Sequence, residues 1–371
     1  MSNGLKVIVS GGGTGGHIFP AISIADAIRS LEPHAEILFI GALGRMEMTR
    51  VPQAGYKIIG LPVMGFDRKH LLKNIKVMYC LMKSRRIARR ILKEFRPDIA
   101  IGVGGYASGP MLKEAARKNV PILIQEQNSY AGVTNKLLAK DAKVICVAYQ
   151  NMERFFPKDK ILLTGNPIRH NLLVNDFTKE MAYSAFGLDP DKSTIAILGG
   201  SLGARTINES VMHNLELIRK SANVQVLWQT GKIYFEEMKQ RLAQTEPVCN
   251  LFPIDFISGM NMLYSISDLV ISRAGAGSIS EFAMLGKAVI LVPSPNVAED
   301  HQTKNALSLS NMNAAVYIPD SDAKETLIPS AFELAHDNER LEQLRSNIKN
   351  FAMPDSARII AEKALQIVEN K

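Results

Sequence analysis

The segment Leu5-Lys-Val-Ile-Val-Ser-Gly-Gly-Gly-Thr-Gly-Gly-His17 decides the fold. Its first residues form a short, mostly apolar run that is typical of a buried strand, and a glycine-rich loop follows at once. Beyond the loop, apolar residues recur at helical spacing to about residue 31. A strand, a glycine loop and a helix in this order are typical of a Rossmann-like unit, whose loop brings backbone N–H groups to the helix N-terminus.

The same alternation continues along both halves of the chain. In the first half, short apolar runs predict strands at residues 37–40, 58–61, 99–103, 122–124 and 144–147. The pattern restarts at residues 194–198, which lead into Gly199-Gly-Ser-Leu-Gly203 and a helix at about 204–220. Later strands are predicted at 224–228, 251–256, 269–272, 289–292 and 315–318. Because parallel strands need crossover helices, this alternation predicts parallel sheets covered on both faces.

We therefore expect an α/β fold with two Rossmann-like domains whose parallel sheets face each other across a cleft. The turn cluster Gly165-Asn-Pro167 separates the two blocks, which places the first domain at residues 1–167 and the second at 168–353. A helix is expected at residues 355–368, and by analogy with this fold residues 354–371 should pack back on the first domain. A length of 371 residues agrees with two cores.

Composition excludes several classes of protein. Hydrophobic residues make up 46% of the chain and charged residues 22%, which excludes disordered, collagen-like and heptad-dominated chains. The three cysteines, Cys80, Cys146 and Cys249, are too few and too scattered for a disulfide framework or a zinc site, so we expect a reducing compartment. Apolar runs are too short for a membrane span, and we expect a chain that is neither secreted nor transmembrane.

Positive charge is concentrated in one segment. The net charge of the chain is +8, yet residues 65–96 hold eleven Lys and Arg against Asp67 and Glu94. Such a cluster points to an anionic partner, either a membrane or a nucleic acid. Within it, apolar residues recur at helical spacing beside lysines, at Leu71, Ile75, Met78, Tyr79 and Met82 with Lys69, Lys73, Lys76 and Lys83.

We expect this segment, over residues 68–93, to bind an anionic membrane surface peripherally. Packing of the apolar stripe into the core is the alternative. After Ser84 the stripe falls out of phase with the later apolar residues, which predicts two helices or a kink there. The second part would carry Arg85, Arg86, Arg89, Arg90 and Lys93.

The glycine loops point to phosphate binding rather than to a dinucleotide site. Gly11, Gly13 and Gly16 match a dinucleotide motif, but the next strand ends Phe39-Ile-Gly-Ala42 without the acid that an NAD site needs. The absence of Gly-Lys-Ser/Thr excludes a P-loop. A further loop leads into Ser278 and Glu281, whose carboxylate could hold ribose hydroxyls; a capping box is the alternative.

Two residues are candidates for a general base. His17 lies in the first turn of a helix, where the positive helix end favours a neutral imidazole. Glu126 lies in a polar cluster after a predicted strand, and it is the rival. The two Asp-x-Asp matches, at residues 189–191 and 320–322, are interpreted as surface turns. We therefore expect neither a metal nor a cofactor, with a diphosphate leaving group held by helix ends, backbone N–H groups and Arg169.

Seven blocks taken together resemble one family. They are Gly-Gly-Thr-Gly-Gly-His17, Gly-Gly-Tyr106-Ala-Ser-Gly-Pro110, Glu126-Gln-Asn128 with Gly132-Val-Thr-Asn135-Lys136, Gly165-Asn-Pro-Ile-Arg169, Gly199-Gly-Ser-Leu-Gly-Ala204, Ser272-Arg-Ala-Gly-Ala276, and Gln302 with Asn305-Ala306. In this order and over nearly the whole chain they resemble the MurG family, the lipid I N-acetylglucosaminyltransferases of bacterial peptidoglycan synthesis. The resemblance implies a GT-B fold.

It also implies an activity. Members transfer GlcNAc from UDP-GlcNAc to the 4-hydroxyl of MurNAc in lipid I, undecaprenyl-diphosphoryl-MurNAc-pentapeptide, with inversion, and release lipid II and UDP. Such an enzyme is a peripheral protein of the cytoplasmic face of the bacterial inner membrane. Its implied partners are UDP-GlcNAc, lipid I, an anionic membrane surface and other cell-wall synthesis proteins, with no nucleic acid.

Matching motifs also imply roles for individual residues. The transferred sugar and acceptor would lie against Thr14, Gly15, Gly16 and Asn128. The nucleotide would be held by Arg169, Ser201, Ile257, Ala276, Gly277, Ser278, Ile279, Ser280 and Glu281. Gln302 matches the position that holds GlcNAc hydroxyls, with Asn305 in the same block. The membrane patch would comprise Ile75, Tyr79, Met82, Lys73, Lys76, Arg86 and Arg90. One position departs from the family pattern, because Gly277 stands where well-known members carry a bulkier apolar residue.

Two other classes of function remain as alternatives. A UDP-GlcNAc 2-epimerase would share the fold and the nucleotide sugar but would need no lipid acceptor. A nucleic-acid-binding protein that uses the basic segment would show steeply salt-dependent binding.

Overall fold

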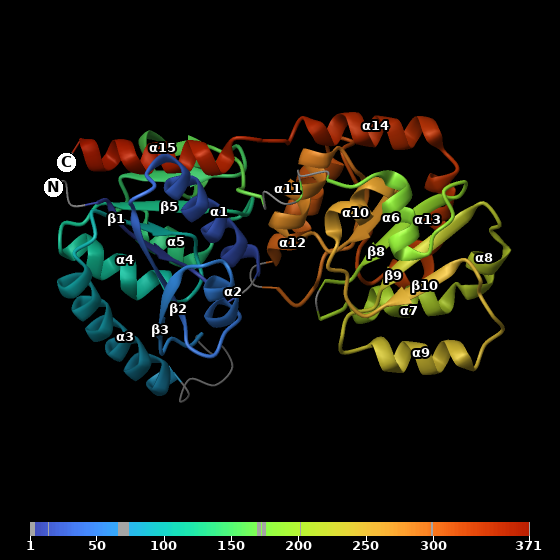
Figure 1. Ribbon diagram of the computed structural model, residues 1–371, viewed down its shortest axis with the longest axis horizontal. Coiled ribbons are helices and arrows are strands. Elements are labelled where there is room, and N and C mark those ends of the chain that lie inside the picture. Colours follow the sequence, from blue (N-terminus) through green and yellow to red (C-terminus); the bar gives the residue numbers. More distant parts are fainter. Residues whose placement is uncertain are drawn as a thin grey trace. The chain divides into compact units, whose positions relative to one another are not determined.

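The computed structural model describes residues 4–13, 15–65, 74–168, 172, 176–200, 202–297 and 300–370. The chain forms two compact units, one of residues 1–169 with 353–371 and one of residues 170–352 (Figure 1). Each unit has its own parallel sheet and its own hydrophobic core. The predicted α/β class with two Rossmann-like domains is therefore confirmed.

The first unit is built on a seven-stranded sheet in the order β3-β2-β1-β4-β5-β6-β7. All its strand pairs are parallel, and Ser10 at the end of β1 pairs with Ile40 on one side and Gly102 on the other. Successive strands are added toward one edge of the sheet from β1 to β3, and toward the other edge from β4 onward. The switch point therefore lies between β1 and β4, which is where open α/β sheets bind ligands. The strands are β1 (Lys6–Ser10), β2 (Glu36–Ala42), β3 (Lys57–Leu61), β4 (Ile99–Gly102), β5 (Ile122–Glu126), β6 (Val144–Val147) and β7 (Ile161–Leu163).

Helices cover both faces of this sheet. The C-terminal helix α15 packs along α1, and its Ile360, Ala361 and Ala364 join the core that surrounds Val7 and Val9 of β1 (Figure 1). On the other face, α3 packs on α4 and α4 packs on α5. The helices are α1 (Gly15–Leu31), α2 (Glu47–Gln53), α3 (Asn74–Phe95), α4 (Ser108–Arg117), α5 (Val133–Leu138) and α15 (Ser356–Glu369).

The second unit is built on a six-stranded parallel sheet in the order β10-β9-β8-β11-β12-β13. The order in which strands are added switches between β8 and β11. The edge where such sheets bind ligands therefore lies at the carboxyl ends of these two strands. Trp228 is fully buried in its core, and the indole nitrogen donates to Oδ1 of Asn208 at 3.0 Å. The strands are β8 (Ser193–Leu198), β9 (Val224–Gln229), β10 (Leu251–Ile254), β11 (Leu269–Ser272), β12 (Ala288–Leu291) and β13 (Val316–Tyr317).

The helices of the second unit flank this sheet on both sides. They are α6 (Lys179–Phe186), α7 (Arg205–His213), α8 (Leu215–Lys220), α9 (Phe235–Ala243), α10 (Met260–Ile266), α11 (Ala276–Leu285), α12 (His301–Ser310), α13 (Ala323–Ala335) and α14 (Asn338–Lys349). The single helix predicted at about 204–220 is thus wrong, because Asn214 separates α7 from α8 and its side-chain amide donates to the carbonyl of Ser210 at 2.8 Å.

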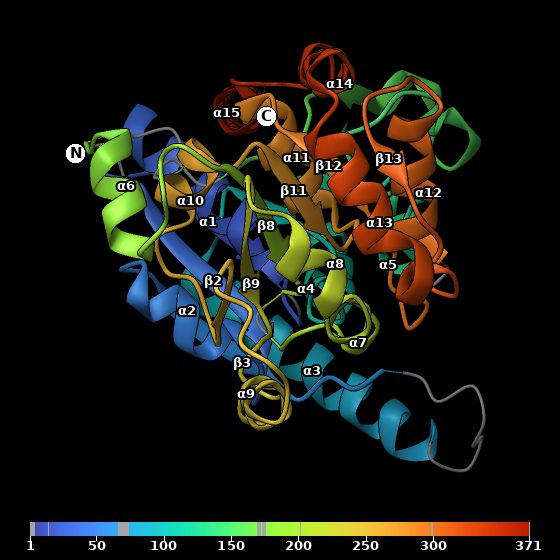
Figure 2. The same cartoon turned by 90° about the vertical axis from the view of Figure 1, so that its right-hand side faces the viewer.

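The predicted kink in the basic segment is also wrong. The helix α3 is continuous from Asn74 to Phe95 (Figure 2). Its buried residues, Val77, Ser84, Ala88, Ile91 and Leu92, follow one face at helical spacing, and the apolar residues 75, 79 and 82 lie on a different, exposed face. Two stripes on two faces therefore looked like one stripe that changes phase. Among the described residues, no helix is both long and apolar enough to cross a bilayer.

Candidate active site

Two glycine loops meet at the switch point of the first sheet. The loop after β1 includes Gly12, and the loop after β4 includes Gly104 and Gly105. A Cβ atom on Gly105 would lie 2.3 Å from the carbonyl oxygen of Gly12, so the two backbones are in direct contact. Gly105 also has φ +82, a conformation that other residues rarely adopt. Glycine at this point is therefore required by both space and backbone conformation.

His17 stands at this junction. It lies in the first turn of α1, as predicted, and it is half-buried. A Cβ atom on Gly104 would lie 3.0 Å from both Cδ2 and Nε2 of the His17 ring. The ring therefore packs on the backbone of the second loop, at the edge where the carboxyl ends of β1 and β4 lie side by side.

The alternative candidate base, Glu126, is buried and holds a loop in place through hydrogen bonds. It ends β5 and is 1% exposed. Its carboxylate accepts from the backbone N–H of Gly132 at 2.9 Å, the side-chain amide of Asn135 at 2.9 Å, and the backbone N–H of Asn128 at 3.1 Å. Burial raises the pKa of Glu126, and the hydrogen bonds from these residues partly oppose that rise. Glu126 thus fixes the loop that carries Asn128 and Asn135.

The remaining site residues predicted in the first unit lie nearby. Gly15 and Gly16 form the start of α1, and the side-chain amide of Asn128 approaches Glu126 at 3.4 Å. Thr14 lies outside the described residues. The structure brings together Gly15, Gly16 and His17 on one element and Asn128 on another, at the same edge of the same sheet.

In the second unit, Gln229 joins two predicted binding segments. Its amide nitrogen donates to the carbonyl of Gly200 at 3.0 Å, and its Oε1 accepts from the backbone N–H of Ile257 at 3.1 Å. Gly200 has φ +80, as the sharp turn after β8 requires. Ser201 in this loop and Arg169 lie outside the described residues. Sequence reasoning missed Gln229, whose place on a buried strand gave no sign of its role.

The helix α11 presents its N-terminus at the end of β11. It begins after Gly275, so Ser278 lies within the first turn rather than at the cap position, and the capping-box alternative is wrong. A Cβ atom on Gly277 would meet nothing within 4 Å, so this turn faces open space. A helix N-terminus next to open space can hold a phosphate through its backbone N–H groups.

The other predicted positions on α11 divide into buried and polar groups. The side chains of Ala276 and Ile279 are buried, while Ser280 donates to the carbonyl of Ala276 at 3.0 Å. Glu281 is 9% exposed, and its Oε2 accepts from the Tyr264 hydroxyl at 3.4 Å. The carboxylate of Glu281 is thus held in place one turn beyond the open helix start.

Two predicted residues on α12 tie neighbouring loops to the site. Oε1 of Gln302 accepts from the backbone N–H of Ser294 at 2.8 Å. Asn305 is fully buried, and its amide donates to the carbonyl of Ala274, just before α11, at 3.3 Å. Asn305 therefore positions the α11 turn, and Gln302 fixes the loop after β12.

The predicted membrane patch lies on the exposed face of α3. Ile75 is 71% exposed, Tyr79 61% and Met82 50%, so core packing, the alternative for this stripe, is wrong. Lys76, Arg86 and Arg90 are exposed on the same helix, and Arg90 pairs with Glu94 at 2.7 Å. Lys73 and Leu71 lie outside the described residues.

Part of the basic charge of α3 serves the fold instead. Glu114 of α4 has a side chain that is 2% exposed, and it pairs with Arg85 at 2.5 Å and Arg89 at 2.7 Å. Arg117 approaches the same carboxylate at 3.5 Å. Burial raises the pKa of Glu114, but hydrogen bonds from Arg89 and Arg85 outweigh it and hold the pKa below its usual value. These two arginines anchor α3 to α4.

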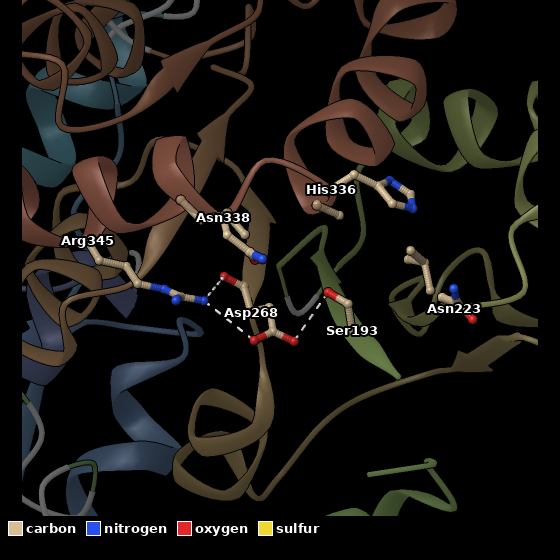
Figure 3. Close-up of a pocket in the computed structure, with 9 residues that line it drawn as sticks. Ser193, Asn223, Asp268, His336, Asn338 and Arg345 are labelled. Atoms are coloured by element: carbon tan, nitrogen blue, oxygen red, sulfur yellow. Dashed lines mark hydrogen bonds and ion pairs between the residues drawn. The ribbon is translucent and has the colours of Figure 1, made fainter. Parts of the chain in front are cut away.

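Figure 3 shows a pocket in the second unit, and none of its lining residues belongs to a glycine loop. Ser193 and Val224 begin β8 and β9, so the pocket is at the edge of the sheet opposite to the ligand edge. There Arg345 donates to the carbonyl of Asp268 at 3.0 Å, and the hydroxyl of Ser193 donates to its carboxylate at 3.3 Å. These bonds hold α14 to the sheet, and the pocket is not part of the candidate site.

The acidic turns form hydrogen bonds of their own. Asp320 accepts from Thr206 at 2.9 Å and pairs with Arg273, and Asp189 accepts from the backbone N–H of Asp191 at 3.0 Å. Within the described ranges, no group of three or more His, Cys, Asp or Glu side chains is placed to share a metal ion.

Comparison with known proteins finds matches to one family of glycosyltransferases. The glycosyltransferase family 28 N-terminal domain matches residues 7–147, and the family 28 C-terminal domain matches residues 194–360. A relative from Bacteroides fragilis is 59% identical over 100% of this chain and 97% of its own length. One from Phocaeicola vulgatus is 60% identical over 100% and 98%. Both are named UDP-N-acetylglucosamine–N-acetylmuramyl-(pentapeptide) pyrophosphoryl-undecaprenol N-acetylglucosamine transferase.

Comparison with solved structures gives a result consistent with these relatives. MurG from Acinetobacter baumannii aligns with a TM-score of 0.77 at 26% identity, over 98% of this chain and 99% of that one. A UDP-GlcNAc 2-epimerase from Neisseria meningitidis, bound to UDP-GlcNAc, aligns with a TM-score of 0.69 at 15% identity, over 98% of this chain and 100% of that one. At that identity the epimerase shares the fold alone.

Proposed function

Because the chain belongs to the family of UDP-N-acetylglucosamine–N-acetylmuramyl-(pentapeptide) pyrophosphoryl-undecaprenol N-acetylglucosamine transferases, we propose that it makes lipid II. It transfers GlcNAc from UDP-GlcNAc to the 4-hydroxyl of MurNAc in lipid I and releases UDP. The observation that carries this proposal is the 59% identity with a named transferase over the whole chain. The glycine loops at both switch points support it, since transfer needs a donor and an acceptor site.

The second unit supplies the donor site. Backbone N–H groups at the start of α11 and in the loop around Gly200 hold the diphosphate, and Glu281 holds the ribose. Ile257 borders the uracil, and Gln302 contacts the GlcNAc hydroxyls. Backbone N–H donors of this kind stabilise the negative charge that develops on UDP as it leaves.

The first unit supplies the base. Inversion follows from one displacement, in which the acceptor oxygen bonds to C1 of GlcNAc from the face opposite to UDP. The C1–phosphate bond breaks, UDP leaves with the electron pair, and the proton of the 4-hydroxyl passes to the imidazole of His17. His17 is the better base because the carboxylate of Glu126 is buried and already accepts hydrogen bonds from the loop of residues 128–135.

The exposed face of α3 brings the enzyme to its lipid-linked acceptor. Ile75, Tyr79 and Met82 enter the headgroup region, while Lys76 and Arg86 meet anionic lipids. Because Arg85 and Arg89 pair with Glu114, they contribute less to this attraction than the charge of the segment predicts. The enzyme would act as a peripheral protein on the cytoplasmic face of the inner membrane.

Transfer of label tests the proposal. The full chain is incubated with UDP-[14C]GlcNAc and a lipid I analogue, and a parallel reaction omits the acceptor. We expect label in the lipid product and an equal amount of UDP, both dependent on the acceptor. Conversion of UDP-GlcNAc to its 2-epimer without acceptor, or no transfer under any condition, would reject the proposal.

A further inference from the structure

We propose that Glu47 is a positioning residue that holds the first glycine loop in its active shape. This inference rests on the proposed function, because the loop is the one that leads into His17. Glu47 begins the short helix α2, far from the loop in sequence, and its side chain is 1% exposed. A buried carboxylate needs several hydrogen-bond donors, and those of Glu47 come from the site.

The carboxylate of Glu47 accepts hydrogen bonds from the first glycine loop and from the end of the neighbouring strand, β2. The backbone N–H of Gly13 donates to both of its oxygens, at 3.1 and 3.0 Å, and the backbone N–H of Ala42 donates to Oε1 at 2.9 Å. Hydrogen bonds to a charged group are about twice as strong as neutral ones. The carboxylate of Glu47 therefore holds the first glycine loop in place.

Two glycines make room for this carboxylate. A Cβ atom on Gly12 would lie 2.0 Å from Oε1 of Glu47, and one on Gly41 would lie 2.5 Å from Cγ. Gly12 and Gly13 have φ +146 and +93, so the loop adopts a shape that suits glycine and exposes its N–H to Glu47. A side chain at either glycine would thus collide with Glu47.

Backbone contacts connect the loop that Glu47 holds to the proposed base, His17. Gly12 packs on Gly105, and Gly104 next to it packs on the ring of His17. A loop released from Glu47 would move relative to both, and with it the start of α1. Small displacements of a catalytic group lower turnover strongly, by about a hundredfold for 1 Å.

The test compares three variants of the full chain. Glu47→Gln keeps the shape but turns one oxygen into an NH2 group facing the N–H donors, and Glu47→Asp keeps the charge but is one methylene short. Glu36→Gln is the control, since Glu36 lies on β2 with an exposed side chain that pairs with Lys6. We expect kcat to fall about ten- to a hundredfold in both Glu47 variants. The KM for UDP-GlcNAc should change less than threefold, and the control should match wild type.

A purely structural role predicts a different result. The melting temperature would fall while kcat per folded molecule stayed normal, and amide exchange at Gly13 would rise no more than elsewhere; either finding would overturn the proposal. If Glu47→Gln does not fold, Gly41→Ala moves the intact carboxylate and should lower kcat as well. If wild type itself transfers no sugar, the proposed function fails, while exchange at Gly13 still reports whether Glu47 holds the loop.

Discussion

The imidazole of His17 packs against the backbone of Gly104, so that a single added methyl group would lie 3.0 Å from its Nε2. This contact joins the helix after β1 to the loop after β4, across the switch point of the first sheet. The position of the proposed base is thus set by a residue with no side chain.

Gly104→Ala should therefore impair catalysis. The new methyl group would press on the His17 ring, and the backbone at φ +87 is strained for alanine, at a cost of about 1 to 3 kcal/mol. Gly55→Ala is the matched control, because Gly55 has φ +81 but open space around its Cβ position. Gly104→Ala should lose at least as much stability as Gly55→Ala in urea unfolding, while kcat should fall about tenfold or more in Gly104→Ala alone. Equal kcat values in the two variants would contradict the contact's role.

His17→Ala should abolish most turnover without weakening donor binding. A positioned base contributes about a hundredfold to ten-thousandfold, so kcat should fall by that factor. The Kd for UDP-GlcNAc, measured by calorimetry, should stay within threefold because the donor site is proposed to lie in the second unit. Near-normal turnover in this variant, with Glu126→Ala inactive, would transfer the role to Glu126.

Glu126 should make stability depend on pH in an unusual direction. Its pKa is raised by burial in the folded state, so its favourable contribution is complete below the usual carboxyl pKa of 4.5 and is lost as pH rises through the higher folded value. The stability of wild type relative to Glu126→Gln should therefore decrease from acidic to neutral pH. Chemical unfolding at several pH values measures this difference. A relative stability that increases with pH would show that its hydrogen bonds outweigh burial.

Glu114 should show the opposite dependence. Its pKa is lowered in the folded state, so its contribution is complete above the usual value of 4.5 and is lost as pH falls through the lower folded value. Glu114→Gln should cost about 1.5 to 3 kcal/mol at neutral pH, as expected for charged hydrogen bonds, and less in acid. Glu94→Gln, which alters an exposed pair with Arg90, is the control and should cost under about 1 kcal/mol. Equal costs for the two variants would show that the buried pair does not anchor α3.

Membrane binding should depend on the exposed face of α3. Replacing Ile75 and Tyr79 by serine should weaken binding to vesicles that contain anionic lipid, and Lys76→Glu with Arg86→Glu should weaken it by about 1 kcal/mol per lost charge. Met181→Ser removes a side chain that is 54% exposed in the second unit, and it should bind as wild type does. Vesicle flotation measures each case. Recruitment that is equal with and without anionic lipid, and unchanged in the charge variants, would reject this surface.

Much of the fold could be predicted from local patterns. Apolar runs and glycine loops located most strands and both switch points, because parallel strands and tight turns leave strong local signals. The short edge strand β7, at Ile161–Leu163, was missed because three partly buried residues carry little pattern. The kink in α3 was predicted wrongly, since the sequence does not tell which of two apolar stripes is buried.

The candidate site was predictable where a motif carries it. His17 and the α11 turn lie in such motifs, and the structure places both at ligand edges. Glu47 and Gln229 were not found, because their roles depend on backbone groups that only the folded chain brings near them. Contacts of this kind are set by tertiary structure and leave no spacing in the sequence.

The linkage in the reaction product shows whether the enzyme transfers GlcNAc to lipid I with inversion. The full chain is given UDP-GlcNAc and a lipid I analogue, and the purified product is examined by proton NMR. We expect one GlcNAc per acceptor, joined to the 4-oxygen of MurNAc with the large H1–H2 coupling of a β linkage, and one UDP released for each sugar transferred. An α linkage, attachment at another oxygen, or UDP-ManNAc in place of a glycoside would rule out this inverting transfer.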